Sequence, residues 1–252
     1  MTQSLRGKTA VVTGASAGIG RATALALAKA GAAVVVQARR KERLEALAAE
    51  IAAQGGQALA VQGDAGVEAD IDRMLEETLR WPAANGKLDV VVVNAGRGLA
   101  GGLLASDSKQ WAQLYQTNVL GAAHLLRQAG KRMVEQRSGD LVVLSSASGK
   151  NISPFSGFYG SSKHAVSAMA EALRREVCGH GVRVTTVMPG IVLSEFQDVA
   201  GYTAENFGKS VARWGKLLEP ESIADAITWV VGLPPHVNVS DLVIRPTGQD
   251  YP

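Results

Sequence analysis

Short runs of apolar, mostly β-branched residues recur along the chain, separated by longer amphipathic stretches. The seven runs are KTAVVTG at 8–14, AAVVVQA at 32–38, QALAVQG at 57–63, LDVVVVNAG at 88–96, GDLVVLSS at 139–146, VRVTTVMPG at 182–190 and DLVIRP at 241–246. Strands that are apolar on nearly every residue are buried on both faces, as in parallel sheets covered by helices. The pattern predicts an α/β fold, a doubly wound parallel sheet of about seven strands flanked by helices.

The stretches between these runs have apolar residues at helical spacing. Two examples, GRATALALAKAG at 20–31 and KERLEALAAEIAAQGG at 41–56, end in glycine, as helices often do. No linker, repeat or low-complexity segment interrupts the alternation. Since α/β folds of 252 residues are commonly one domain, we expect residues 1–252 to form a single domain.

Composition excludes several classes of protein. Hydrophobic residues make up 46% of the chain, enough for a large core, and the net charge of +3 comes from basic residues interleaved with acidic ones. The single cysteine, Cys178, excludes an intrachain disulfide, and the four histidines lack metal-ligand spacing. There is no signal-peptide region and no apolar run near the roughly 20 residues that span a bilayer. We expect no metal site, no nucleic-acid or membrane partner, and a cytoplasmic location.

The first predicted strand runs directly into a glycine-rich turn, TGASAGIG at 13–20, and then into a helix. Gly14, Gly18 and Gly20 permit a tight turn and close approach of the backbone to a ligand, and the helix N-terminus offers free N–H groups to a pyrophosphate. The spacing differs from the G-x-G-x-x-G form. Its position after the first strand still predicts a dinucleotide-binding turn at the carboxyl ends of the strands.

The stretch YGSSK at 159–163 places a phenol and an ammonium four residues apart. On a helix, Tyr159 and Lys163 lie on one face and can reach one point in space. The following residues, 164–177, bury a different stripe, so the pair is free to face a cavity. A partly buried tyrosine beside a lysine whose stem covers apolar surface is the alternative.

Six motifs together resemble the short-chain dehydrogenase/reductase family over almost the whole chain. They are TGASAGIG at 13–20, NAG at 94–96, TN at 117–118, SS at 145–146, YGSSK at 159–163 and PG at 189–190. The resemblance implies a Rossmann-like dinucleotide-binding catalytic domain that transfers a hydride between a nicotinamide and a carbonyl or secondary alcohol. The residues it implies for cofactor binding are Gly14, Ser16, Gly18, Ile19 and Gly20 at the pyrophosphate, Asp64 at the adenine, Asn94, Ala95 and Gly96 in the nucleotide cleft, and Pro189, Gly190, Val192 and Ser194 near the nicotinamide.

The resemblance also implies four catalytic residues, Asn118, Ser146, Tyr159 and Lys163. Hydride transfer to a carbonyl needs a proton donor, and we expect Tyr159 to serve as acid and base. The charge of Lys163 is expected to lower the pKa of the phenol, and its ammonium to hold the nicotinamide ribose. Ser146 would polarise the substrate oxygen, and Asn118 would bind a water that links Lys163 to solvent.

The segment QARRKERL at 37–44 indicates which nicotinamide cofactor is used. An NAD enzyme of this fold places an acidic side chain at the end of the second strand, but Ala38 stands there, followed by Arg39 and Arg40. A guanidinium binds a 2′-phosphate through paired, charge-assisted hydrogen bonds. We therefore expect NADP, and a roughly 10- to 150-fold loss of NADPH affinity without Arg39, with Arg40 of comparable or smaller effect. Two solvated arginines opening a surface helix are the alternative.

Residues 191–219 break the alternating pattern and are expected to form a small helical substrate lid. The segment carries the aromatic residues Phe196, Tyr202, Phe207 and Trp214.

The substrate stays open between a small hydroxy acid, a ketone and an aldehyde. The tail, residues 219–252, resembles those of NADP-dependent 3-hydroxy acid dehydrogenases and of reductases of larger aldehydes and ketones. A carboxylate would need a cation, and the candidates are Arg97, Lys209 and Arg213, whereas an apolar wall would come from Leu99, Phe155 and Phe158.

A homotetramer or homodimer is expected from the family resemblance, with helix 165–177 partly at a subunit contact. The alternative function is a catalytically silent NADP-binding sensor or scaffold of the same fold. Loss of Tyr159 or Lys163 would favour that alternative, and both residues are present.

Overall fold

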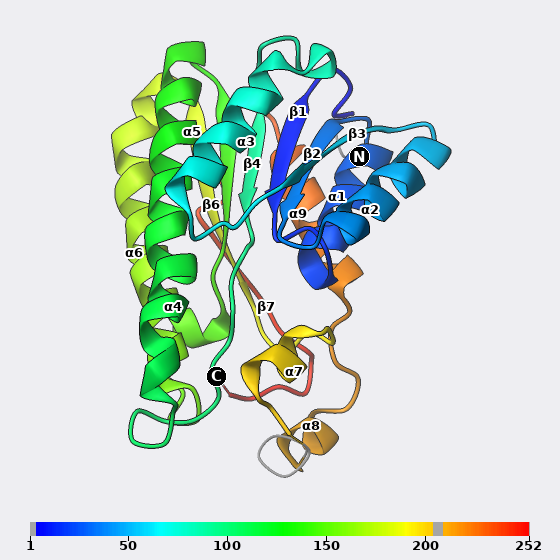
Figure 1. The fold of residues 1–252 in the computed structure, drawn as a ribbon. Helices are drawn as coiled ribbons and strands as arrows, with labels where there is room; N and C mark the ends of the chain where they lie inside the picture. The colour runs from blue at the N-terminus through cyan, green and yellow to red at the C-terminus, as the bar shows by residue number, and fades with distance from the viewer. Residues whose placement is uncertain (1–3, 204–208, 252) are drawn as a thin grey trace.

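A parallel sheet with helices on both faces forms the centre of the molecule (Figure 1). The structure is a computed structural model and describes residues 4–203 and 209–251. Within those residues the sheet has seven strands in the order β3-β2-β1-β4-β5-β6-β7, every neighbouring pair parallel. They are β1 (Thr9–Thr13), β2 (Ala33–Ala38), β3 (Gln57–Gln62), β4 (Val90–Val93), β5 (Gly139–Leu144), β6 (Val182–Pro189) and β7 (Asp241–Ile244). The predicted doubly wound, Rossmann-like sheet is confirmed.

Both faces of the central strands are buried, which explains their unbroken apolar sequence. The α-helices of the described residues are α1 (Gly18–Lys29), α2 (Lys41–Ala53), α3 (Glu68–Arg80), α4 (Trp111–Tyr115), α5 (Ala122–Gln136), α6 (Gly157–Val177), α7 (Phe196–Ala200), α8 (Lys209–Trp214) and α9 (Pro220–Val231). In β1, Ala10 and Val12 belong to the core cluster under α1, α2 and α9, whereas Val11 belongs to the cluster under α3, α5 and α6. The neighbouring strand β2 alternates in the same way.

Glycine ends the first two helices as the sequence predicts. Gly31 after α1 and Gly55 after α2 have φ of 102° and 79°, a left-handed conformation that glycine adopts without a steric penalty.

A wide, π-helical turn, Gln116–Gly121, joins α4 to α5. Gly121 lies against the loop after β3, and a Cβ there would overlap the carbonyl oxygen of Ala65. The close approach of this turn to the loop therefore requires glycine at position 121.

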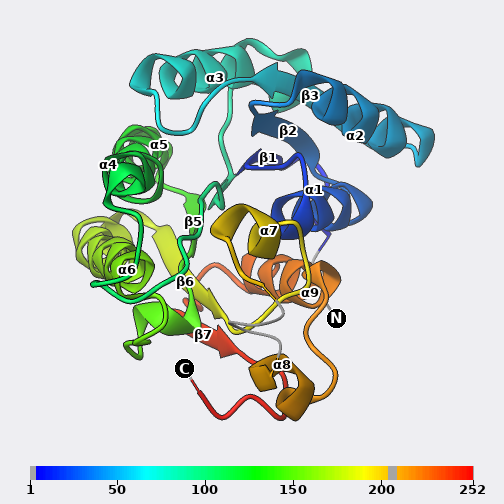
Figure 2. The same cartoon turned by 60° about the horizontal axis from the view of Figure 1, so that its bottom comes forward.

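Because the strands are parallel, their carboxyl ends all lie at the same end of the sheet, and α7 lies over them (Figure 2). This is the end at which ligands bind in open parallel sheets. Of the helices in the described part of the chain, none combines the length and apolar character that crossing a bilayer would require.

Candidate active site

The glycine-rich turn packs directly against the segment after β4. Gly14 has φ of 68°, and a Cβ there would lie 2.9 Å from the Cα of Ala95. A Cβ on Gly20 would come too close to the Asn94 amide and to the Gly14 carbonyl oxygen. The Asn94 side chain donates a hydrogen bond to the Thr13 carbonyl oxygen at 2.8 Å. The turn and the NAG motif, predicted to flank one nucleotide cleft, are therefore side by side.

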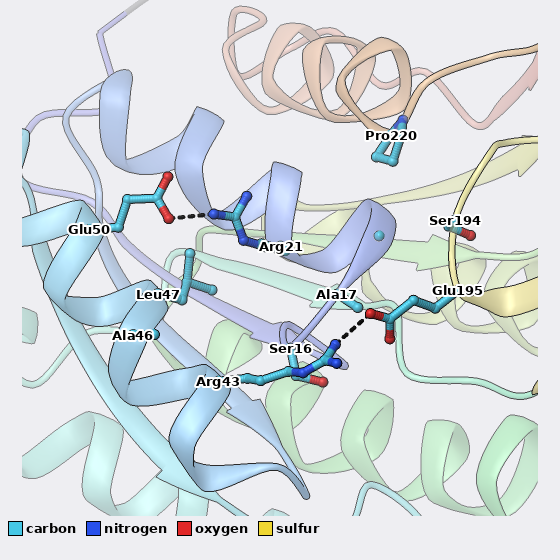
Figure 3. Close-up of a pocket in the computed structure, with 11 residues that line it drawn as sticks. Ser16, Ala17, Arg21, Arg43, Ala46, Leu47, Glu50, Ser194, Glu195 and Pro220 are labelled. Carbon is cyan, nitrogen blue, oxygen red and sulfur yellow. Dashed lines mark hydrogen bonds and ion pairs between the residues drawn. The ribbon is translucent and has the colours of Figure 1, made fainter.

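The turn has room and donors for a pyrophosphate. Helix α1 begins at Gly18, and Ala17 before it supplies no side-chain cap to the first helical N–H groups. A groove of about 420 Å³ begins at the turn, between Ala17 and Ser194, and continues along α1 and α2 past Arg21, Leu47 and Glu50 (Figure 3). The partly buried Ile19 packs against the core under α1. These features fit a dinucleotide.

The segment after β6 reaches across to this turn. Pro189 ends β6, and the Gly190 N–H donates to the Ile244 carbonyl oxygen at 2.7 Å. Val192 is buried. A Cβ on Gly18 would lie 3.2 Å from the Ser194 Cβ. The four residues expected near the nicotinamide thus lie on one stretch of chain, which runs from the carboxyl end of β6 to the glycine-rich turn.

The two arginines after β2 point to different places. Arg40 donates to the Ser16 hydroxyl from Nε at 3.1 Å and from Nη2 at 2.9 Å, so it lies over the glycine-rich turn. The Arg39 side chain is 71% exposed, and its Nη1 is 3.9 Å from Asp64 Oδ2. Arg39 and Asp64 line a second hollow of about 360 Å³ together with Gln62, Gly63, Asp70 and Arg73.

Three of the four expected catalytic side chains meet around α6 and the end of β5. Tyr159 and Lys163 lie within α6, as predicted, and both are buried. Lys163 Nζ donates to the Leu144 carbonyl oxygen at 2.7 Å and lies 5.9 Å from the centre of the Tyr159 ring. Ser146 follows β5, and its hydroxyl interacts with the Tyr159 phenol and accepts the Ser148 N–H at 3.1 Å.

The fourth residue, Asn118, lies in the π-helical turn. Its Oδ1 accepts the Arg97 N–H at 2.9 Å, and its Nδ2 donates to the Arg97 carbonyl oxygen at 2.9 Å and to the Ser162 hydroxyl at 3.1 Å. A Cβ on Gly96 would lie 3.2 Å from Asn118 Oδ1 and 3.5 Å from Lys163 Nζ. The structure therefore brings together the four residues that the motifs single out.

The pKa of Tyr159 differs from the expectation. Burial raises the pKa of Tyr159 above its ordinary value, and the hydrogen bond with Ser146 opposes this only partly. Burial also lowers the pKa of Lys163 to about 8. The expected lowering of the Tyr159 pKa by Lys163 is therefore wrong for the chain without cofactor. Desolvation dominates, and the ammonium is held by the Leu144 carbonyl oxygen.

The lowered pKa of Lys163 predicts a pH-dependent stability of the cofactor-free chain. Unfolded, the lysine keeps its proton up to about 10.5, whereas the folded chain releases it at about 8. Between these values the unfolded state binds more protons, so the folded state gains stability as pH rises, by up to about 3 kcal/mol. We expect the free energy of unfolding of wild type, relative to Lys163→Met, to rise from pH 8 to 10 in urea titrations. A difference that stayed constant with pH would contradict this.

The walls around Tyr159 are mostly apolar. Leu99 is buried beside Tyr159 and Leu114, and the Phe196 ring lies 5.7 Å from the Tyr159 ring. Of the other two expected wall residues, Phe158 stacks on Trp111 with 4.3 Å between the ring centres and packs against the same cluster as Phe196, whereas Phe155 is 70% exposed.

Two of the three candidate cations for a carboxylate substrate are engaged elsewhere. Arg97 contacts the Gln110 and Gln113 side chains on α4 and the turn before it. Arg213 pairs with Asp250 at 2.6 Å. The side chain of Lys209 lies outside the described residues, as does all of Phe207.

Two residues of the site escaped the sequence reasoning. Glu195 accepts a hydrogen bond from Arg40 at 2.9 Å and another from Arg43 at 2.5 Å. Arg43 lies in the first turn of α2, three residues after Arg40, which is the extended residue just before the helix. Its nearness to Arg40 in the sequence was a signal that it belongs to the same cluster. Nothing in the sequence indicates Glu195, because it is 155 residues away from Arg40 in the chain.

A buried tyrosine–lysine pair together with a glycine-rich turn is typical of an oxidoreductase that binds a dinucleotide cofactor. Comparison with known proteins gives the same class. The family model described as short chain dehydrogenase matches residues 8–203. The chain is 38% identical to the farnesol dehydrogenase of Aedes aegypti, over 97% of this chain and 98% of that protein. The chain therefore belongs to the short-chain dehydrogenase family of oxidoreductases.

Three solved structures share the fold. An alcohol dehydrogenase from the archaeon Thermococcus sibiricus, complexed with 5-hydroxy-NADP, has a TM-score of 0.83 at 30% identity and covers 96% of this chain and 97% of its own. The closed form of serine dehydrogenase complexed with NADP+ has a TM-score of 0.86 at 31% identity, with 96% of each chain covered. A 3-ketoacyl-(acyl-carrier-protein) reductase from Brucella melitensis, complexed with NADH, has a TM-score of 0.86 at 27% identity and covers 97% of this chain and 99% of its own. Structures of this fold are thus complexed with 5-hydroxy-NADP or NADP+ in two of these cases and with NADH in the third.

Proposed function

We propose that this protein is an NADP-dependent oxidoreductase that transfers a hydride between the nicotinamide and an uncharged ketone or aldehyde, or the corresponding alcohol. One observation carries the proposal: Ser146, Tyr159 and Lys163 converge beside the strand ends, across from a glycine-rich turn over which Arg40 lies. A catalytically silent sensor or scaffold would keep the turn but would have no need for the buried phenol and ammonium.

The side chains fit acid catalysis of carbonyl reduction. NADPH, when bound, supplies the hydride to the carbonyl carbon. The Ser146 hydroxyl polarises the carbonyl oxygen, and Tyr159 donates its phenol proton to that oxygen as the alcohol forms. Because burial raises the pKa of Tyr159, the phenol carries the needed proton at neutral pH. In the reverse direction the Tyr159 phenolate would accept the alcohol proton, and the raised pKa of the phenol keeps this form scarce at neutral pH in the cofactor-free chain.

Lys163 is well suited to resupply the proton. A pKa of about 8 allows its ammonium to lose and regain a proton near neutral pH. The Asn118 amide already donates to Arg97 and Ser162 and accepts from Arg97. We therefore assign the expected water relay to the backbone of the π-helical turn, and the Asn118 side chain to holding that turn in place.

The pocket favours an apolar substrate over a hydroxy acid. Leu99 and Phe196 flank Tyr159, and two of the three candidate cations, Arg97 and Arg213, have other partners. The expected lid spans residues 191–219, of which 204–208 lie outside the described residues. Its described part fits a lid, since α7 lies over the strand ends (Figure 2) and the Phe196 ring lies 5.7 Å from the Tyr159 ring. A screen of uncharged ketones and aldehydes against small 3-oxo acids, followed by NADPH oxidation, tests the choice. Faster turnover of the acids would contradict it.

Arg40→Ala should weaken NADPH binding by about 10- to 150-fold and leave NADH binding nearly unchanged. The guanidinium lies over the turn, where it would bind the 2′-phosphate, and hydrogen bonds to charged groups are worth roughly 1.5 to 3 kcal/mol. Arg39→Ala should have a smaller effect, because that side chain leans toward Asp64. Fluorescence titration of both cofactors checks this. Equal wild-type affinity for NADPH and NADH would contradict the assignment of NADP.

Assembly and location stay predictions. We expect a homotetramer or homodimer in the cytoplasm. Sedimentation that gave only a 26.3 kDa species at micromolar concentration would contradict the assembly.

A further inference from the structure

Glu195 links the segment after β6 to the start of α2 across the glycine-rich turn. Its Oε2 accepts from Arg40 Nη1 at 2.9 Å, and its Oε1 accepts from Arg43 Nη1 at 2.5 Å. The other guanidinium nitrogens of Arg40 bind the Ser16 hydroxyl. Figure 3 shows the carboxylate of Glu195 pointing over the turn toward Arg43. One acidic side chain thus spans the turn and engages two guanidinium groups.

Two guanidinium groups that converge on a carboxylate present the same donors that a phosphate accepts. Arg40, Arg43 and Glu195 are each about half exposed, at 44%, 48% and 49% of their side-chain surface, so a ligand has access to them. The hydrogen bonds from Arg40 and Arg43 hold the pKa of Glu195 below its ordinary value, and the carboxylate is therefore ionised at neutral pH. Glu195 occupies Nη1 of both arginines, whereas Nε and Nη2 of Arg40 bind the Ser16 hydroxyl.

We propose that Glu195 is an internal competitor for the 2′-phosphate of NADP, and that a 2′-phosphorylated nucleotide displaces its carboxylate from Arg40 and Arg43. This inference rests on the proposed NADP function. An exposed ion pair is weak, whereas a phosphate monoester carries nearly two negative charges at neutral pH, so the exchange favours the phosphate. The unphosphorylated ribose of NAD brings no anion and leaves the pair intact.

Displacement of the Glu195 carboxylate by a phosphate takes place next to a helix, α7, that contacts Tyr159. Glu195 immediately precedes α7, and the next residue, Phe196, packs against the Tyr159 ring at 5.7 Å. The far end of α7 is tied to the loop after β4 by the hydrogen bond from the Ala100 N–H to the Ala200 carbonyl oxygen at 2.8 Å. Releasing Glu195 therefore removes one tie at the near end of α7, where the Gln197 side chain still contacts Ser194 and Val192.

Glu195→Gln should tighten the binding of 2′,5′-ADP by about 3- to 10-fold and leave 5′-ADP within about twofold. Glutamine keeps the shape but loses the charge, so Arg40 and Arg43 are available to the phosphate more of the time. Isothermal titration calorimetry measures both nucleotides without turnover. Glu50→Gln is the matched control: Glu50 lies along the same groove and loses the same charge, but it pairs with Arg21 (Figure 3). It should change neither affinity by more than about twofold.

A double-mutant cycle separates competition from a general charge effect. In an Arg40→Ala background, Glu195→Gln should tighten 2′,5′-ADP by less than it does in wild type, because one of the contested donors is gone. Suppose that Arg40→Ala weakens 2′,5′-ADP binding but Glu195→Gln leaves it unchanged or weaker than in wild type. Glu195 would then not compete with the phosphate, and the NADP assignment would still stand. Tightening of both nucleotides, or equal tightening by Glu50→Gln, would also overturn the competition by Glu195. A wild-type protein that binds the two nucleotides equally would overturn both proposals.

Discussion

Tyr159→Phe should lower kcat for carbonyl reduction by about 10²- to 10⁴-fold while NADPH binding stays within about twofold of wild type. The substitution removes only the hydroxyl that donates the proton, and proton transfer by a positioned side chain contributes rate factors of this size. The ring stays, so its packing against Leu99 and Phe196 is kept. Single-turnover reduction of the best ketone or aldehyde, with a parallel NADPH titration, measures the two effects separately.

Tyr115→Phe is the matched control for this experiment. Tyr115 also loses a hydrogen-bonded hydroxyl, which lies 2.8 Å from the Ser161 hydroxyl, but it belongs to α4 and has no place among the proposed catalytic groups. Its rate should stay near that of wild type. If Tyr159→Phe kept more than a tenth of the wild-type rate, another group would have to be the acid.

Lys163→Met should weaken NADPH and NADH alike, by about 10- to 150-fold, and should lower kcat as well. The ammonium is proposed to hold the nicotinamide ribose, which both cofactors share, and a hydrogen bond from a charged group is worth roughly 1.5 to 3 kcal/mol. The same residue is proposed to resupply the Tyr159 proton, so the turnover number falls too. This equal loss distinguishes Lys163 from Arg40, whose removal should affect NADPH alone.

Lys150→Met removes an exposed lysine near the same end of the sheet and should change neither cofactor affinity nor turnover. Circular dichroism and the urea titrations described above establish that the Lys163 variant is folded. A folded Lys163→Met protein that bound both cofactors with wild-type affinity would remove the ribose-binding role.

The sheet could be predicted from the sequence because its signal is local. Burial on both faces leaves the central strands nearly continuous in apolar residues, and all seven predicted runs contain the observed strands, with ends shifted by up to three residues. The helix that carries Tyr159 and Lys163 could be predicted for the same reason, since Val166, Ala170 and Val177 mark its buried stripe. The motifs then located the candidate site, because the carboxyl ends of parallel strands gather at one edge.

The rest of the site depends on distances that the sequence does not contain. The direction of the Tyr159 pKa follows from how completely the fold removes the phenol from water, and no residue near it in sequence reveals that. The outward position of Phe155 is likewise decided by the loop in which it lies. The contact between Glu195 and Arg40 joins two surface segments whose separate patterns carry no sign of each other.

The π-helical turn between α4 and α5 makes the length of this helical segment as important as its composition. A π-turn holds more residues than an α-turn, and a change of one residue rotates everything beyond it by about 100°. Asn118 before Gly121 faces the site, and Leu125, Ala129 and Met133 after it face the sheet. A one-residue deletion in this turn would rotate one side of it relative to the other. Either the Asn118 amide would turn away from Lys163, or the apolar residues of α5 would turn away from the core. Substitutions at positions other than Gly121 leave that phase intact, so apart from this glycine the segment should tolerate changes of residue better than changes of length.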